Sequence, residues 1–199
     1  YKCEKIAIEK IKHFVSKDAL NIEGLGKKVV EKFWDLKFIR LPNDIFNLDY
    51  NKIEKLEGWG ELSSSNLKES IEKSKNIGLA KFIFSLGIRH IGQENAKILS
   101  EYFQTKEKFY KVSEKFNFNS LNNIDGIGET QVRSLKIFFS NSTNLNNISN
   151  LIKELNVIDF KTSKSGIFYG KTIMFTGGLN KMSRAEAKSL VEKEGGKIL

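Results

Sequence analysis

Four short glycine-containing hairpins recur along the chain at a nearly constant interval. Three of them read IEGLGKK, LEGWGEL and IDGIGET, and a fourth reads LGIRHIGQE. Their glycines are Gly24, Gly26, Gly58, Gly60, Gly87, Gly92, Gly126 and Gly128. When His90 is aligned with the first glycine of the other pairs, the spacings are 34, 32 and 36 residues. Such a period is typical of a structural repeat.

Helical patterns flank these hairpins. Apolar residues at helical spacing precede the third hairpin, resume after it and recur after the fourth. These positions are Leu79, Phe82, Ile83 and Leu86, then Ala96, Leu99 and Phe103, then Val132, Leu135 and Phe139. The repeat unit is therefore predicted to be a helix, a glycine hairpin and a second helix.

The pattern changes near Asn156. Residues 156–167 are predicted to be a polar linker, and a short apolar strand is expected at 172–175. A helix should follow in SRAEAKSLVEKE, because Ser183 and Glu186 have the spacing of a capping box. The last residues, GGKIL, read as the start of a second strand. This part is predicted to be an α/β piece.

The composition limits the class of protein. A hydrophobic content of 40% in 199 residues predicts a folded chain, and a single cysteine excludes an internal disulfide framework and suits a reducing cytosol. The sequence has neither a signal peptide nor an apolar run long enough to span a membrane. We read it as a soluble piece of a longer protein. Its net charge of +9 favours a polyanionic partner.

The hairpins have the chemistry of an anion site. A second glycine two positions after the first is expected to let the backbone adopt a positive φ and to keep side chains away from an approaching ligand. The residue between the glycines can fix the hairpin in the core, and we expect Trp59 to pack there rather than stack on a base. Free amides at the start of the next helix would bind a phosphate without sequence preference. One Gly-x-Gly is more often a simple connector, but four copies at one period favour the anion site.

The motifs carry a resemblance to a known family. They resemble helix-hairpin-helix DNA-binding motifs, and KHFVSKDALNIEGLG and LAKFIFSLGIRHIGQENAK resemble the array of bacterial NAD-dependent DNA ligases. GKTIMFTGGLNKMSRAEAKSLVEKEGGKI is similar to the opening of the BRCT domain that ends those ligases. The resemblance implies a mainly α fold with four tandem helix-hairpin-helix motifs, of the SAM and RuvA domain 2-like class, followed by a truncated α/β BRCT piece.

The resemblance also implies a division of the chain and a set of contacts. Residues 1–17 would be the tail of a zinc-finger region with a lead-in helix, 18–155 the DNA-binding domain, 156–167 a linker and 168–199 the first part of a BRCT domain. The expected DNA-binding residues are Gly24, Leu25, Gly26, Lys27, Lys28, Gly58, Trp59, Gly60, Gly87, Arg89, His90, Ile91, Gly92, Gly126, Ile127, Gly128 and Arg133.

The parent protein would use NAD, magnesium and zinc, but we expect none of them bound to this piece. Cys3 matches the last ligand of the family's four-cysteine zinc finger, and one thiol cannot make that site. The family's nucleophile is the lysine of Lys-x-Asp-Gly, and Asn123 stands in its place in the nearest match, NIDG. The piece is therefore expected to have no catalytic residue and to bind DNA without sealing it.

The family implies a partner and a compartment. The expected partner is nicked double-stranded DNA, held from its minor-groove side during replication and repair. The expected compartment is the bacterial cytoplasm or nucleoid, with a monomeric chain and no membrane. One alternative is a helix-hairpin-helix module of a repair nuclease or a junction-binding protein. Another is a protein-binding helical solenoid, because the tetratricopeptide repeat has a similar period.

Overall fold

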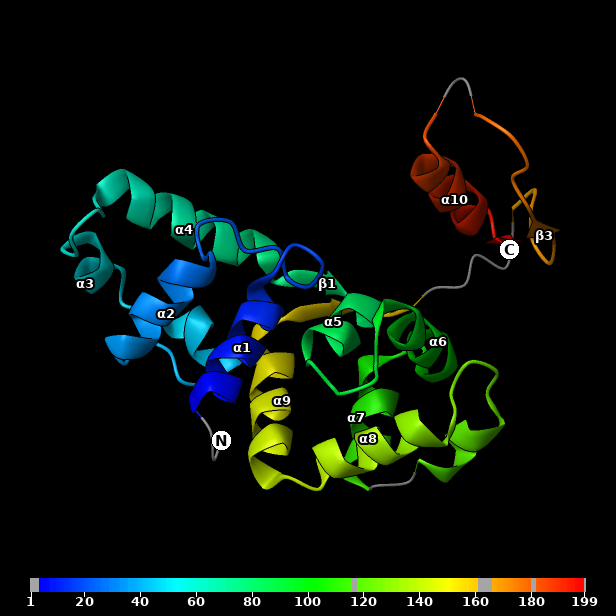
Figure 1. The fold of residues 1–199 in the computed structure, drawn as a ribbon, viewed down its shortest axis with the longest axis horizontal. Helices are drawn as coiled ribbons and strands as arrows, with labels where there is room; N and C mark the ends of the chain where they lie inside the picture. The colour runs from blue at the N-terminus through cyan, green and yellow to red at the C-terminus, as the bar shows by residue number, and fades with distance from the viewer. Residues whose placement is uncertain (1–3, 116–117, 161–165, 180–181, 199) are drawn as a thin grey trace. The chain divides into compact units, whose positions relative to one another are not determined.

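Helices make up most of the structure, a computed structural model that describes residues 4–115, 118–160, 166–179 and 182–198 (Figure 1). The chain forms two compact units, Tyr1–Phe160 and Lys161–Leu199. The first is almost entirely helical, and the second is a small α/β piece. This confirms the predicted fold class, mainly α with a small α/β part. Within the described ranges, no helix is both long and apolar enough to cross a bilayer.

The first two hairpins lie in the N-terminal half of the first unit. Each joins a helix to a second helix that begins at the last glycine of its hairpin. The helices of this half, in chain order, are α1 (Glu4–Val15), α2 (Lys27–Asp35), the 3-10 helix η1 (Pro42–Asn47), α3 (Tyr50–Glu54) and α4 (Glu61–Ser74).

The third and fourth hairpins follow the same plan. The third lies between α5 and α6, and the fourth lies between the 3-10 helix η2 and α8. The elements of this half are β1 (Asn76–Gly78), α5 (Leu79–Ser85), α6 (Gln93–Phe103), α7 (Lys106–Glu114), η2 (Asn119–Asn123), α8 (Glu129–Phe139), α9 (Ser142–Glu154) and β2 (Asn156–Ile158).

The apolar stripes read from the sequence face the core. The stripes of α5, α6 and α8 are buried, as the helical spacing predicts. These residues belong to one continuous hydrophobic cluster that runs through the first unit. Because the cluster includes residues of all four motifs, the array has a shared core.

Two short strands join the ends of the second half. β1 and β2 pair in parallel with Asn76 opposite Asn156, and the Asn156 side-chain amide donates to Asn76 Oδ1 at 2.8 Å. Residues 156–158, which the sequence placed in the linker, therefore form part of the first unit. The strand has only three residues, Asn-Val-Ile, and its pairing partner lies 80 residues away, so no local pattern marks it.

The second unit has the predicted order of strand, helix and strand. β3 (Thr172–Ile173) pairs in parallel with β4 (Lys197–Ile198), and α10 (Arg184–Lys193) lies between them in the chain. β3 is shorter than the predicted 172–175. Ser183 caps α10 and forms the expected capping box with Glu186.

Candidate nucleic-acid interface

All four hairpins have the same backbone turn. An apolar residue begins the turn, the residue two positions later has a positive φ, and the next amide donates to the carbonyl of the first residue. The positive-φ residues are Gly24 (+84°), Gly58 (+80°), His90 (+62°) and Gly126 (+83°). The closing bonds are Leu25 to Ile22 at 3.4 Å, Trp59 to Leu56 at 2.9 Å, Ile91 to Ile88 at 3.0 Å and Ile127 to Ile124 at 3.0 Å.

The third hairpin confirms the alignment of His90 with the first glycine. His90 has a left-handed backbone, which is unusual for a residue with a Cβ atom, and its side chain is exposed. Gly87 belongs to a different feature. It also has a positive φ, of +63°, but it follows α5 and lies against α1, where an added Cβ would meet His13 Cδ2 at 3.3 Å. Gly87 therefore ends a helix and is not part of the repeated turn.

The second glycine of each hairpin corrects one expectation from the sequence. The positive φ belongs to the first residue of the pair, while the second glycine has a negative φ and an extended ψ and is the N-cap of the following helix. Any residue can adopt that backbone. A Cβ atom added at Gly26, Gly60 or Gly92 would meet nothing within 4 Å, and at Gly128 it would meet only Gln131 Oε1 at 3.3 Å.

Neither backbone geometry nor internal packing explains glycine at these N-caps. Serine, aspartate and asparagine stabilise this position by about a few tenths of a kcal/mol more than glycine, because their side chains accept a hydrogen bond from the first turn. None of the four glycine caps provides such a bond. The first helical amides also have no acceptor within their own helix. The arrangement leaves open space in front of a cluster of amide donors at the positive end of a helix dipole, which suits a bound anion.

The apolar residues between the glycines fix the hairpins. Leu25, Ile91 and Ile127 are buried. Trp59 is half-buried, and its ring packs 5.5 Å from that of Phe33, between ring centroids. These side chains hold the turns in place. The amides of Gly60, Gly92 and Gly128 donate to Ser63 Oγ, Asn95 Oδ1 and Gln131 Oε1, so the donors that remain at these sites are the first amides of the following helix.

The hairpins also pack in pairs. Gly24 of the first hairpin lies against α4 of the second motif, where an added Cβ would meet Leu67 Cδ1 at 3.5 Å. Gly126 of the fourth hairpin lies against Ile98 of α6 in the third motif. There the Asn95 side-chain amide donates to the Gly126 carbonyl at 2.9 Å. Asn95 is thus a positioning residue without a recognisable signal in the sequence.

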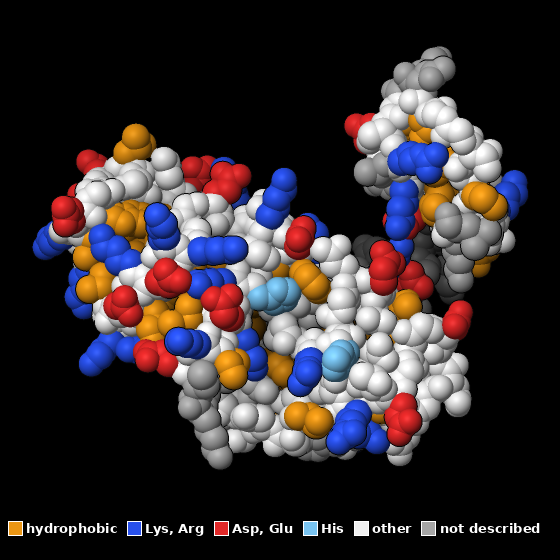
Figure 2. Space-filling model, in the orientation of Figure 1, with side chains coloured by type: hydrophobic (Ala, Val, Ile, Leu, Met, Phe, Trp, Pro, Cys, Tyr) orange, Lys and Arg blue, Asp and Glu red, His pale blue; other side chains and the backbone are white. Residues whose placement is uncertain are grey.

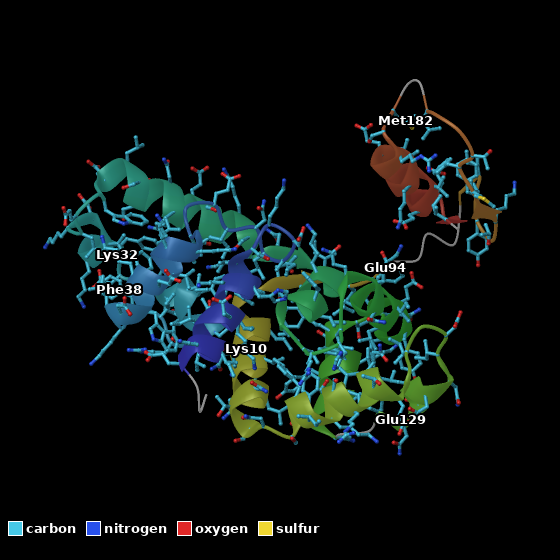
Figure 3. The ribbon with its side chains drawn as sticks, in the orientation of Figure 1. Lys10, Lys32, Phe38, Glu94, Glu129 and Met182 are labelled. Atoms are coloured by element: carbon cyan, nitrogen blue, oxygen red, sulfur yellow. The ribbon has the colours of Figure 1, made fainter. Side chains whose placement is uncertain are left out.

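Charged side chains distinguish the four sites. Lys27 and Lys28 occupy the first two positions of α2 and are exposed, as is Arg89 in the third hairpin. Figure 2 shows lysine and arginine side chains interspersed with acidic ones on the visible face of the first unit. Glu61 begins α4, and Glu129, labelled in Figure 3, begins α8. An acidic residue precedes the first glycine in three hairpins: Glu23, Glu57 and Asp125. Arg133, which the sequence also predicted to bind DNA, is exposed one turn into α8. The first site, with two lysines and one glutamate, is the most basic, and the second and fourth each carry two acidic residues.

The predicted zinc ligand, Cys3, falls outside the described residues. The described part of the chain has no cluster of three or more His, Cys, Asp or Glu side chains suited to a metal. His13 has a packing role. Its Nε2 donates to the Phe84 carbonyl at 2.8 Å. Its ring packs edge-to-face with the Phe84 ring, with 4.7 Å between the ring centroids.

Comparison with known proteins gives consistent results. Residues 81–148 match the helix-hairpin-helix motif family. The chain is 59% identical over its whole length to a DNA ligase of Pelagibacter ubique. Over 98% of its length it is 43% identical to a DNA ligase of Rickettsia bellii and 45% identical to one of Ehrlichia canis. In each case the match covers 30% of the relative, so the chain spans about a third of their length.

Proposed function

The chain is homologous along its whole length to a segment of DNA ligases, and we propose that in the intact ligase it holds duplex DNA at a nick. The helix dipoles and amide clusters of the hairpins would bind phosphates of both strands from the minor-groove side. Because every nucleotide carries the same phosphate, this binding has no sequence preference.

The open N-cap glycines carry this proposal. A hairpin that served only as a connector would gain stability from a serine or aspartate at its N-cap. Glycine at all four positions, with no side-chain cap and empty space beside three of them, leaves room for a ligand to approach the backbone. A phosphate is the nucleic-acid group that accepts several amide hydrogen bonds at a helix N-terminus.

The chain's part in ligation is binding and positioning. We propose an NAD-dependent parent, in which NAD supplies the adenylyl group that activates the 5′-phosphate for attack by the 3′-hydroxyl. Asn123 cannot act as the nucleophilic lysine, so no step of nucleotide transfer is assigned to this chain. Holding both strand ends in line lowers the barrier by removing translational and rotational freedom. Among the described residues, no group of three or more His, Cys, Asp or Glu side chains could hold zinc.

We propose that the second unit is the first part of a BRCT domain. Its strand, capped helix and parallel strand would be the elements with which such a domain opens. We further propose that the chain acts as a monomer on DNA in the bacterial cytoplasm or nucleoid. The basic charge of +9 supports an anionic partner.

The test compares the parent chain with Gly26→Ser. Duplex affinity is measured across a salt series for two unrelated sequences, with thermal melts alongside. We expect equal affinity for both sequences and a salt slope smaller than the number of phosphates contacted, because amides release no counterions. Gly26→Ser should melt at the same or a higher temperature, since serine caps the helix better, and should bind at least about fivefold more weakly, because its side chain fills the anion site.

Because melting temperature and duplex affinity are measured on the same variant, a loss of affinity that comes from unfolding would be recognised. If Gly26→Ser binds both duplexes as tightly as the parent at every salt concentration, the hairpin amides do not hold phosphate. If the parent shows no affinity for duplex even at low salt, the proposed function is wrong as a whole.

A further inference from the structure

A surface groove lies between α1 and the third hairpin, outside the amide sites. Its volume is about 460 Å³. Helix α1 contributes Lys5, Ile6, Glu9, Lys10 and His13, and the chain after α5 contributes Gly87, Ile88 and Ile91. None of the α1 residues belongs to a glycine hairpin, so the repeat does not account for this groove.

The two walls are fixed against each other. His13 of α1 is bonded to the Phe84 carbonyl at 2.8 Å, and Gly87 leaves just enough room for the His13 ring. Ile88 and Ile91 belong to the turn that presents the amides of α6, and Gly92 follows directly. The groove therefore borders the turn that carries the third proposed phosphate site.

The groove combines an apolar surface with positive charge. Ile6 is 55% exposed, which is unusual for an isoleucine. Among the described residues, Glu9 is the one acidic residue that lines the groove, and its carboxylate is paired with Lys12 at 2.6 Å. That pairing leaves the charges of Lys5 and Lys10 to dominate.

Lys10, labelled in Figure 3, is held close to the protein. Its ammonium lies 5.5 Å from the centre of the Phe138 ring, and partial burial lowers the pKa of its side chain. Lys5 is exposed at the start of α1 and has no ion pair among the described residues. An anion in the groove would offset the loss of hydration at Lys10 and meet Lys5 without displacing a partner.

We propose that this groove binds a sugar-phosphate segment of the strand whose neighbouring phosphate is held by the third hairpin. A nucleic-acid backbone alternates apolar sugar faces with anionic phosphates, which matches an isoleucine surface beside two lysines. Because the groove residue Ile91 directly precedes Gly92, the segment would belong to the strand whose phosphate meets the third hairpin. This inference rests on the proposed function and extends the DNA-binding surface to α1.

The test uses two variants of the 199-residue chain, each with a matched control. Lys5→Gln is compared with Lys153→Gln, an exposed lysine on α9, and Ile6→Ser with Ile137→Ser, which is 64% exposed on α8. Duplex affinity is measured across a salt series, and melting temperatures are recorded. Neither groove variant should change the melting temperature beyond its control.

The two groove variants should weaken duplex binding in different ways. Lys5→Gln should reduce the salt slope by up to about 0.9 and lower affinity about five- to tenfold at ~0.1 M salt. Ile6→Ser should weaken binding with the slope unchanged, because it removes apolar contact and no charge. If the parent binds duplex and Gly26→Ser weakens it, but both groove variants behave as their controls, the groove proposal is wrong and the hairpin proposal stands. Failure of the parent to bind any duplex would overturn both.

Discussion

Gly126 lies so close to Ile98 that a Cβ atom on Gly126 would come within 2.5 Å of Ile98 Cδ1. The contact joins the fourth hairpin to α6, and the bond from Asn95 to the Gly126 carbonyl reinforces it. Gly126 thus meets two independent demands, a positive φ and close packing. Gly58, in the same position of the second hairpin, meets only the first, since nothing lies within 4 Å of its Cβ position.

We therefore expect Gly126→Ala to destabilise the first unit by about 2–3 kcal/mol and Gly58→Ala by about 1 kcal/mol. Both variants strain a left-handed backbone, and only the first also forces Ile98 from its rotamer. Denaturant titration followed by tryptophan fluorescence measures this, because Trp34 and Trp59, the chain's two tryptophans, both lie in the first unit. Equal losses for the two variants would show that Ile98 yields without cost.

The sequence predicted the features that depend on local pattern. The helical stripes of α5, α6 and α8, the turn at His90 and the capping box of Ser183 all follow from residues a few positions apart. It assigned the positive φ to the wrong glycine of each pair. The pattern Gly-x-Gly does not say which residue turns the chain, and only the backbone shows that the second glycine is an N-cap.

Other features depend on contacts between distant segments. The parallel pairing of Asn76 with Asn156 and the bond from Asn95 to Gly126 join residues with no local relationship. The groove beside the third hairpin likewise arises because His13 holds α1 against Phe84. Lys5 and Lys10 were ordinary helix lysines in the sequence, and packing alone places them next to a hairpin.

His90 supplies a prediction of opposite sign. Its left-handed backbone strains a residue with a Cβ atom by about 1–2 kcal/mol. Glycine removes this strain but gives the unfolded chain more conformational entropy. His90→Gly should therefore stabilise the first unit by up to about 1 kcal/mol. The neighbouring Arg89→Gly, which relieves no such strain, should destabilise it by about 0.5–1 kcal/mol. Denaturant titration of both variants provides the comparison. Destabilisation by His90→Gly as large as that by Arg89→Gly would contradict the repeat alignment.

The capping box of α10 predicts a titration. Hydrogen bonds from the Ser183 amide, and then from its hydroxyl, lower the pKa of Glu186 below its ordinary value. A carboxylate with a lowered pKa stabilises the folded helix above its ordinary pKa, and this contribution is lost as the pH falls through the lowered value. NMR titration should show the low pKa. Ser183→Ala removes the hydroxyl's bond to the carboxylate and its cap on the Glu186 amide, but keeps the bond from the Ser183 amide. The pKa should therefore rise part of the way, and a full return to the ordinary value would assign the whole effect to the side chain.

The glutamates that begin α4 and α8 predict that the four sites contribute unequally to DNA binding. Glu61 begins α4 and lies next to Gly60, where a phosphate would meet its carboxylate. The same carboxylate favours the helix, because a negative charge at the N-terminus interacts well with the dipole. Glu61→Gln should therefore lower the stability of the first unit by about 0.3–1 kcal/mol and yet raise duplex affinity several-fold at low salt.

The matched control is Glu114→Gln, an exposed residue that ends α7 and gives the same change in net charge. It should raise affinity less, because its charge is screened from the hairpin, and should not destabilise the chain, since a carboxylate at a helix C-terminus is unfavourable. Affinity measured across a salt series, with melts alongside, separates the two variants. Equal gains in affinity would mean that only net charge matters and that the second hairpin has no special place on the DNA. A larger gain at Glu61, accompanied by lower stability, would mean that its carboxylate trades DNA affinity for helix stability at this hairpin.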